Sequence, residues 1–179
     1  MFYAINVIFS VTSVKGAICI VGLKLKTYFC FFVSSSCARL RICMLINWLL
    51  KNLGDTFEIE DALYDKIFTN MIERLRDKVA EIRAQAVTAL FRLQNPRDPD
   101  CPVIKAFLFH LGCDPSALVR RTIIKNIGSS KIVLGFIIKR ISDTDETVRV
   151  AAYKFLAEKV IISKYFSERT ILNTLNEKL

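Results

Sequence analysis

The chain of 179 residues is 53% hydrophobic and 24% charged, with only four prolines and six glycines. This composition provides enough apolar residues for a packed core and excludes a disordered chain. The formal net charge of +9 is unevenly spread: residues 1–50 carry five basic and no acidic residues, residues 51–113 nine and ten, and residues 114–179 twelve and seven. A polyanionic partner is therefore favoured only by the last third of the chain.

Metal and enzyme signatures are missing from the sequence. The six cysteines form no C-x-x-C pair, and there is one histidine, which disfavours zinc sites. No phosphate-binding loop, dinucleotide fingerprint, H-E-x-x-H or G-x-S-x-G motif occurs. We therefore predict no metal, no cofactor, no catalytic residue and no enzymatic activity, and the cysteine usage leans toward a reducing compartment.

Residues 1–36 differ in kind from the rest. The stretch Phe2–Leu23 is almost long and apolar enough to cross a membrane, but its flanks are wrong for a secretory signal. Three interpretations stay open: a membrane anchor, a divergent first helix pair, or residues that do not belong to the native protein. The last is slightly favoured, and a membrane association of the whole chain is not expected.

Residues 38–93 show three stretches of helical periodicity. A wide apolar stripe begins at Ala38 and stops at Gly54, a residue suited to the position after a helix. Ile59–Leu75 repeats apolar residues at intervals of four after an acidic start, as the helix dipole prefers. A third helix continues to Leu93, and its alanines permit close helix approach.

Residues 95–102 contain three prolines and form the clearest predicted loop. Helices are predicted over Val103–Leu111 and Lys131–Ile141, with a break at Gly128–Ser130 between them. A further helix turns its apolar residues inward, namely Val148, Ala151, Ala152, Phe155 and Leu156. The last predicted helix runs from Ser167 to Leu179, with no polar cap after it.

One unit recurs three times along these helices. An Asp precedes an Arg by six positions in Asp77–Arg83, Asp114–Arg120 and Asp143–Arg149, so the arginines lie 37 and 29 residues apart. The Asp is expected to cap the helix that follows, and Pro115 to take a first helical position. Because one helical hairpin cannot bury its own apolar face, the predicted fold is all-α, an α-solenoid of stacked hairpins.

The units and the alanines after them resemble HEAT repeats. The chain also resembles the condensin complex subunit 3 family, the non-SMC HEAT subunits of condensin, over residues 37–179, in Arg41–Leu50, Leu63–Ile67, Arg74–Lys78, Val87–Leu93, Pro102-Val103, Val119–Arg121, Asp143, Val148-Arg149 and Ala152–Val160. The pattern fails at Arg39, where the Asp expected six residues earlier is Val33. We expect two parts: residues 1–36, of uncertain status, and residues 37–179, an array of about three to four repeats cut from a longer one.

The resemblance implies a function. Members of this family bind the kleisin subunit of condensin and form with it a basic groove that grips double-stranded DNA without base readout, while the SMC ATPases of the complex do the work. The expected location is the nucleus and mitotic chromosomes, with a cytoplasmic pool. The alternative is a HEAT adaptor that holds protein segments and never touches DNA.

Two sets of charged residues are candidates for these roles. The repeated register of the units suggests a structural inter-repeat ladder of charge-assisted bonds, formed by Asp77, Arg83, Asp114, Arg120, Asp143 and Arg149. The DNA-phosphate candidates come from the stretch without acids between Pro115 and Ser142 and from the helix after it, and they are Arg121, Lys125, Lys131, Lys139, Arg140 and Lys154. A solvated helix face is the competing interpretation of the second set.

Other residues are read as structural. His110 and Cys113 share a helix face, but no orienting acid is free to make the thiol a nucleophile, so we expect core or helix-end roles. Trp48, among Leu and Ile, is expected in the core rather than as a kleisin anchor. The same core position is predicted for six aromatic residues, Tyr64, Phe91, Phe107, Phe109, Tyr153 and Phe155.

Overall fold

A computed structural model of the chain describes residues 35–52, 61–98 and 100–162, and within these ranges it contains helices and no strand. The predicted all-α class is therefore confirmed. The elements are α3 (Ser36–Asn52), α4 (Asp61–Arg74), α5 (Ala80–Leu90), η1 (Phe91–Leu93), α6 (Pro102–Cys113), α7 (Ala117–Asn126), α8 (Lys131–Lys139), η2 (Arg140–Ser142) and α9 (Glu146–Ile162).

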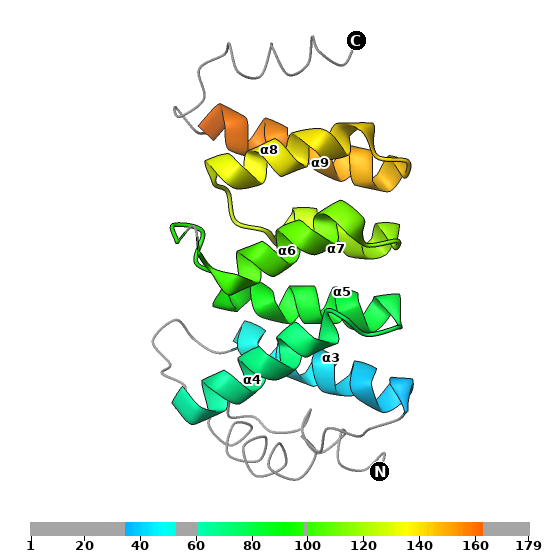
Figure 1. Cartoon of the computed structure of the whole chain (residues 1–179), viewed down its shortest axis with the longest axis vertical. Coiled ribbons are helices and arrows are strands. Elements are labelled where there is room, and N and C mark those ends of the chain that lie inside the picture. The colour runs from blue at the N-terminus through cyan, green and yellow to red at the C-terminus, as the bar shows by residue number, and fades with distance from the viewer. Residues whose placement is uncertain (1–34, 53–60, 99, 163–179) are drawn as a thin grey trace.

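The helices form two rows that run along a stack (Figure 1). The B row consists of α3, α5, α7 and α9, each packed against the next, and the A row consists of α4, α6 and α8. Contacts within the B row are more extensive than those within the A row. Each A-row helix continues through a tight corner into the following B-row helix, which is the hairpin design of a HEAT-type solenoid.

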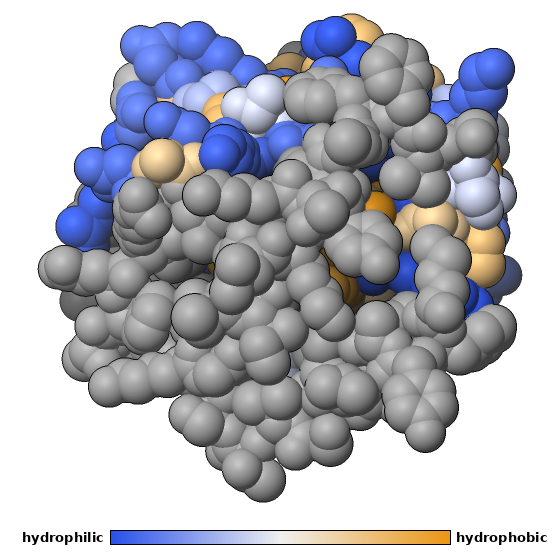
Figure 2. Space-filling view, turned by 90° about the horizontal axis from the view of Figure 1, so that it is seen from below, coloured by the Kyte–Doolittle hydropathy of each residue, from blue (hydrophilic) through white to orange (hydrophobic). Residues whose placement is uncertain are grey.

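The core lies between the two rows. Ile67 and Met71 on α4 and Leu75 directly after it recur at intervals of four and are fully buried, as the periodicity predicts. On α5, the buried alanines include Ala86 and Ala89, whose small side chains let α3 and α7 approach closely on either side. Viewed along the stack, hydrophilic residues of the described part lie at the margin and hydrophobic ones nearer the centre (Figure 2).

The helix starts correct one prediction. The unit Asp residues do not cap helices: α7 begins at Ala117 with Ser116 as its N-cap, so Asp114 and Pro115 both precede the helix. Asp114 Oδ1 instead accepts a hydrogen bond from the Ser116 N–H at 2.9 Å, closing a side-chain turn before the helix. The physical reason is that the carboxylate is held by an arginine of another unit, as described below.

The positions of the aromatic residues correct a second prediction. Phe107 and Phe155 are buried, whereas four of the six aromatics predicted in the core are exposed, namely Tyr64, Phe91, Phe109 and Tyr153. Phe109 follows Phe107 by two positions, about 200° around a helix, so the two side chains cannot share the core face. Trp48 is partly buried against the core.

Several predicted features lie outside the described residues: the apolar segment through residue 34, the helix stop at Gly54 and the final helix from Ser167. The proposed division of the chain at residue 36 therefore stays a prediction. No helix in the described ranges has the length and apolar character needed to span a bilayer.

Candidate functional site

Arginines and aspartates of successive units are joined by buried bidentate pairs. Arg83 donates from Nε to Asp114 Oδ2 at 2.8 Å and from Nη2 to Oδ1 at 2.7 Å. Arg120 makes the same two bonds to Asp143, at 2.9 and 2.7 Å. The partner of each Arg is thus the Asp of the next unit, so each pair ties two layers of the stack together.

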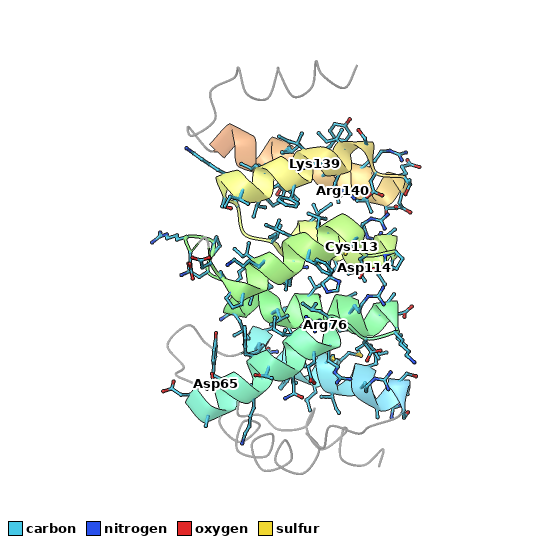
Figure 3. The ribbon with its side chains drawn as sticks, in the orientation of Figure 1. Asp65, Arg76, Cys113, Asp114, Lys139 and Arg140 are labelled. Carbon is cyan, nitrogen blue, oxygen red and sulfur yellow. The ribbon has the colours of Figure 1, made fainter. Side chains whose placement is uncertain are left out.

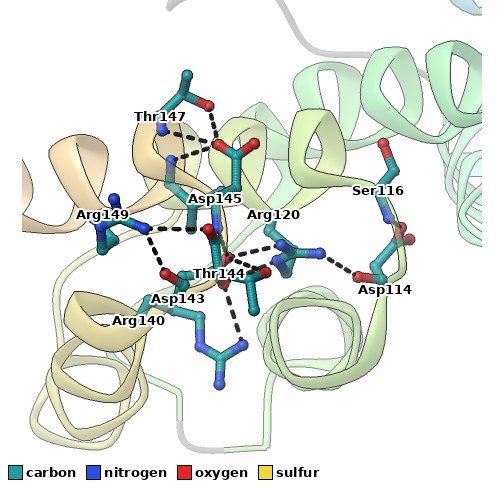
Figure 4. Close-up of polar contacts among 10 residues, drawn as sticks. Asp114, Ser116, Arg120, Arg140, Asp143, Thr144, Asp145, Thr147 and Arg149 are labelled. Carbon is teal, nitrogen blue, oxygen red and sulfur yellow. Dashed lines mark hydrogen bonds and ion pairs between the residues drawn. The ribbon is translucent and has the colours of Figure 1, made fainter.

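The third nitrogen of each arginine holds the corner of its own unit. Nη1 donates to a backbone carbonyl six residues earlier in three cases, Arg83 to Asp77 at 2.9 Å, Arg120 to Asp114 at 2.8 Å and Arg149 to Asp143 at 2.9 Å. This contact explains the constant spacing of six in the sequence. Each guanidinium that makes both kinds of bond therefore links its own corner to the next one (Figure 4).

A further rung joins α3 to the corner after α4. Arg39 donates from Nε to Asp77 Oδ2 at 2.7 Å and from Nη2 to Oδ1 at 3.2 Å. Sequence reasoning missed this residue because it sought an Asp before Arg39, at Val33, rather than the Asp of the following unit. The signal that could have found it is Asp77 itself, which otherwise has no arginine of a preceding unit.

A second basic residue contacts each of these aspartates from the end of the preceding A-row helix. Arg74 Nη1 lies 3.4 Å from Asp77 Oδ2, and Arg140 Nη1 lies 3.4 Å from Asp143 Oδ2. In the middle unit the same place is taken by His110, whose Nδ1 is 3.3 Å from Asp114 Oδ2. Figure 3 shows Arg76, Asp114 and Arg140 one above another on the side of the stack where the corners lie. Asp65 lies at the opposite side.

The environment of the three carboxylates keeps them ionised. Burial of Asp114 raises its pKa, but the hydrogen bonds from Arg83 and from the Ser116 N–H outweigh burial, so the net pKa is lowered. The balance is the same for Asp77 with Arg39 and for Asp143 with Arg120. Because both partners of the Arg83–Asp114 pair are almost fully buried, this is a structural feature and not a surface open to ligands.

Three of the DNA-phosphate candidates lie on the B row. Arg121 and Lys125 are one turn apart on α7 and share a helix face. Lys154 on α9 follows its unit's ladder arginine by five positions, as Lys125 does, so the two exposed lysines occupy matching places on adjacent helices. Within the described ranges, no acidic side chain forms an ion pair with any of the three.

The other three candidates lie on the A row. Lys131 and Lys139 are exposed at the two ends of α8, and the Lys139 ammonium sits 5.5 Å from the centre of the Phe136 ring. Arg140 forms an ion pair with Asp143. Arg120 and Arg140 both pair with Asp143, so the acid that follows the acid-free stretch neutralises part of it. The assignment of the six candidates to DNA phosphates stays a prediction.

The cysteine and histidine candidates show no catalytic arrangement. His110 contacts Asp114, while Cys113 is exposed and its Sγ donates to the Phe109 carbonyl oxygen. The thiols of four cysteines are free in the part of the chain that the structure describes, namely Cys37, Cys43, Cys101 and Cys113. The same part contains no cluster of side chains able to hold a metal ion.

Known proteins resemble this chain in sequence. Condensin complex subunit 3 of Xenopus laevis is 47% identical over 129 residues, and the human protein of that name is 42% identical over 127. These alignments cover 72% and 71% of the chain. The chain spans 12% of the length of each relative. No model of a known protein family matches the chain.

A solved structure resembles it as well. The crystal structure of the Schizosaccharomyces pombe condensin Cnd3-Cnd2 subcomplex matches with a TM-score of 0.73 and 26% identity, covering 98% of this chain and 22% of that one. The likeness agrees with the two-row helical stack. The chain therefore belongs to the condensin complex subunit 3 family and matches one segment of the relatives' length.

Proposed function

We propose that this segment is a non-catalytic HEAT scaffold of a condensin regulatory subunit, which docks part of the kleisin subunit and contacts double-stranded DNA without reading its sequence. Family membership and the ladder-stiffened stack support a scaffold role. The observation that carries the DNA contact is the trio of Arg121, Lys125 and Lys154, which forms no ion pair in the described part of the chain.

The chemistry of the trio suits phosphates. Lys125 and Lys154 are exposed on neighbouring helices, and Arg121 is partly exposed one turn away from Lys125. Cations grouped in this way replace condensed counterions on the DNA backbone, which gives affinity without base specificity. The A-row cations Lys131 and Lys139 are the second choice, because they stand at opposite ends of α8.

The kleisin contact is inferred from the relatives. The solved neighbour is a complex of Cnd3 with Cnd2, the kleisin subunit. The present chain matches 22% of the length of the aligned chain in that complex. Association with the SMC ATPases and residence on mitotic chromosomes in the nucleus follow from the same proposal, through the complex.

A matched pair of charge-reversal variants tests the DNA contact. The first variant changes Arg121, Lys125 and Lys154 to Glu, and the second, the control, changes Lys66, Arg76 and Arg97, three exposed basic residues outside the candidate set, to Glu. Duplex binding is measured by mobility shift over a range of salt, with the kleisin subunit present. We expect the B-row variant to bind all sequences more weakly, with the slope of log affinity against log salt shallower by about 2 to 3.

Both variants lose the same net charge, so a general electrostatic effect weakens them equally. An equal loss in the control variant, or an unchanged slope in the B-row variant, rejects the B-row site.

A second titration separates the proposal from a protein-only adaptor. The chain is titrated in three series: with the recombinant kleisin subunit alone, with duplex DNA alone, and with both together. Kleisin binding together with DNA retention supports the full proposal. Kleisin binding without DNA retention favours the adaptor, and no kleisin binding rejects the scaffold role for this segment.

A further inference from the structure

The outer face of the A row carries apolar side chains at positions that are open to solvent. Phe109 on α6 is 66% exposed, more than any other large apolar side chain in the described ranges, and Ile132 on α8 is 54% exposed. Phe136, one turn after Ile132, is partly exposed. We call Phe109, Ile132 and Phe136 the A-row patch. Exposed apolar residues that gather in one place are typical of an interaction surface.

The corners of the stack fix the register of the three A-row helices. Arg74, His110 and Arg140 occupy the same place, because each contacts the Asp of its own unit. The positions one, four and eight before them share a helix face. That face contains Lys66, Asn70 and Glu73 on α4, Pro102, Ala106 and Phe109 on α6, and Ile132, Phe136 and Lys139 on α8. Since α6 and α8 pack side by side, the apolar members of their two lines form one surface.

This face points to solvent and not toward the next layer of the stack. α8 packs beside α6, yet Pro102 and Phe109 of α6 are exposed. A further helix beside α8 would therefore leave Ile132 and Phe136 uncovered in the same way. On α4 the three positions are polar, as expected of a solvated face, whereas on α6 and α8 only Lys139 is polar.

Two lysines stand at the edges of the A-row patch. Lys139 takes on α8 the place that Phe109 takes on α6, and its Nζ lies 5.5 Å from the centre of the Phe136 ring. Lys131 is exposed at the first position of α8. No acidic side chain in the described ranges forms an ion pair with either lysine. The patch therefore combines apolar surface with positive charge.

The acids of neighbouring elements do not neutralise this charge. Neither α6 nor α8 contains an acidic residue. Glu73 on α4 contacts Arg74 at 3.5 Å, and Asp100 before α6 contacts Lys105 at 2.6 Å. The aspartates of the ladder at the ends of these helices are buried. An occupant complementary to the patch is therefore both acidic and apolar.

The spacing of the two lysines sets the length of the occupant. Lys131 and Lys139 are eight residues apart on α8, which corresponds to about 12 Å between their Cα atoms. An extended peptide rises roughly 3.3 Å per residue, so about four residues reach from one lysine to the other. An apolar side chain between two acids of such a peptide lies over Ile132 and Phe136.

We propose that the A-row patch docks an extended segment of a partner protein, in which acidic residues about four positions apart flank a large apolar side chain. A second copy of the chain is less suitable, because two patches placed face to face bring their lysines together without an acid from α6 or α8. Duplex DNA is less suitable, because its phosphates leave Phe109 and Ile132 in water. The site lies on the A row and the proposed duplex contact on the B row, so either can fail without the other.

Selection from a random peptide library tests the recognition. Phage-displayed peptides of about nine residues, long enough to cover the patch, are selected on the full 179-residue chain and counter-selected on its Phe109→Ser variant. We expect the recovered sequences to place Asp or Glu on both sides of a Phe, Leu, Ile or Trp. Recovery of nothing above the counter-selection, or of sequences without acids, overturns the proposal.

A recovered peptide is then synthesised with a fluorophore and titrated by anisotropy. Phe109→Ser should weaken its binding by about tenfold or more. The double variant Lys131→Gln with Lys139→Gln should weaken it by about threefold to tenfold and flatten its salt dependence. These side chains are exposed, so thermal melts of both variants should match the parent chain.

The matched controls change the same residue types elsewhere. Phe91→Ser alters a phenylalanine that is 45% exposed after α5, and Lys66→Gln alters an exposed lysine of α4. Both should bind the peptide as the parent chain does. Equal weakening in these controls overturns the proposal, because binding then does not depend on the A-row patch.

Three further results assign the patch to another occupant and overturn the proposal. Displacement of the peptide by duplex DNA, together with weaker duplex binding of Phe109→Ser, makes the patch a nucleic-acid contact. A concentration-dependent dimer that Phe109→Ser dissociates makes it a contact between copies. Displacement by the recombinant kleisin subunit makes it part of the kleisin contact. We expect the peptide to stay bound in the presence of both kleisin and DNA.

Discussion

Arg39 and Asp77 are joined by two hydrogen bonds, at 2.7 and 3.2 Å, across 38 residues of chain. The pair has the geometry of Arg83–Asp114 and Arg120–Asp143, although no Asp stands six residues before Arg39. Each ladder arginine therefore pairs with the carboxylate of the Asp in the following unit, and not with the carboxylate of the Asp that precedes it in its own unit. A variant at one corner acts on two layers of the stack.

Breaking the middle rung is expected to be costly. Asp114→Ala leaves the buried guanidinium of Arg83 without its carboxylate, and the free energy of unfolding should fall by about 3–5 kcal/mol. The double variant Arg83→Met with Asp114→Leu should recover much of this, since it removes both charges. Urea unfolding measures both. Asp100→Ala, which breaks an exposed pair with Lys105, is the control and should change little; an equal loss there contradicts the prediction.

The ladder predicts a pH dependence with a defined sign. The folded-state pKa values of Asp77, Asp114 and Asp143 are lowered, so their contribution to stability is fully present above the unfolded-state pKa, near ~3.9 for Asp, and is lost as the pH falls through the lowered values. The free energy of unfolding should therefore decline steeply below about pH 4.

Asp114→Asn is the comparison for this pH series. It is less stable at neutral pH and has one fewer carboxylate to protonate, so its decline in acid should be shallower. Urea unfolding between neutral pH and strong acid gives both curves, and parallel curves would show that this carboxylate does not contribute.

Two glycines are expected to respond in opposite directions to substitution by alanine. A Cβ on Gly128 falls 2.2 Å from Pro96 Cγ and 2.8 Å from Pro96 Cβ, and the proline ring cannot move aside easily. Gly128→Ala should therefore cost about 1–3 kcal/mol. Gly135, inside α8, has nothing within 4 Å of its added Cβ, so Gly135→Ala should stabilise by about 0.5–1 kcal/mol. Thermal melts of both variants check the signs.

The Gly128 contact belongs to a clamp between two loops. Gln94 Oε1 accepts from the Gly128 N–H at 2.7 Å, and Gln94 Nε2 donates to the Asn126 carbonyl oxygen at 2.8 Å. A loss of stability in the Gly128→Ala variant should therefore be accompanied by faster hydrogen exchange of the backbone amide at position 128. Unchanged exchange there would mean that the clamp adapts to the methyl group.

The cysteines should differ in reactivity. Burial raises the pKa of the Cys43 thiol to about 12, so almost no thiolate forms at pH 8 and alkylation should be slow. Cys37 and Cys113 are exposed and should react with iodoacetamide before Cys43 and Cys101, which are buried. Peptide mapping by mass spectrometry measures the order of labelling. Equal rates in the folded chain, without denaturant, would contradict the burial of Cys43.

Much of the fold could be predicted from the sequence, because helix periodicity and repeated corners are local patterns. The pairing of the ladder could not be read in full, since the distance from each Arg to its Asp varies with loop and helix length. The constant spacing of six that the sequence displays belongs to a different bond, from Nη1 of Arg120 to the Asp114 carbonyl, for example.

The basic candidates illustrate the limit of reasoning along the chain. Arg120 and Arg121 are adjacent, yet Arg120 is buried against Asp143 and Arg121 lies on the partly exposed face of α7. Lys125 and Lys139 are close in sequence but belong to different rows. Only the packing of α7 on α9 places Lys125 and Lys154 at matching positions, so their role in DNA binding stays a prediction that experiment must test.

The double grip of each ladder arginine has a consequence for how the stack comes apart. Arg120 holds the peptide carbonyl of one corner and the side chain of the next, so one layer cannot melt without removing a partner from its neighbour. In a linear array, strong nearest-neighbour coupling of this kind enlarges the cooperative unit. These layers should therefore denature in a single sharp transition, where a stack without such coupling would fray gradually from its ends.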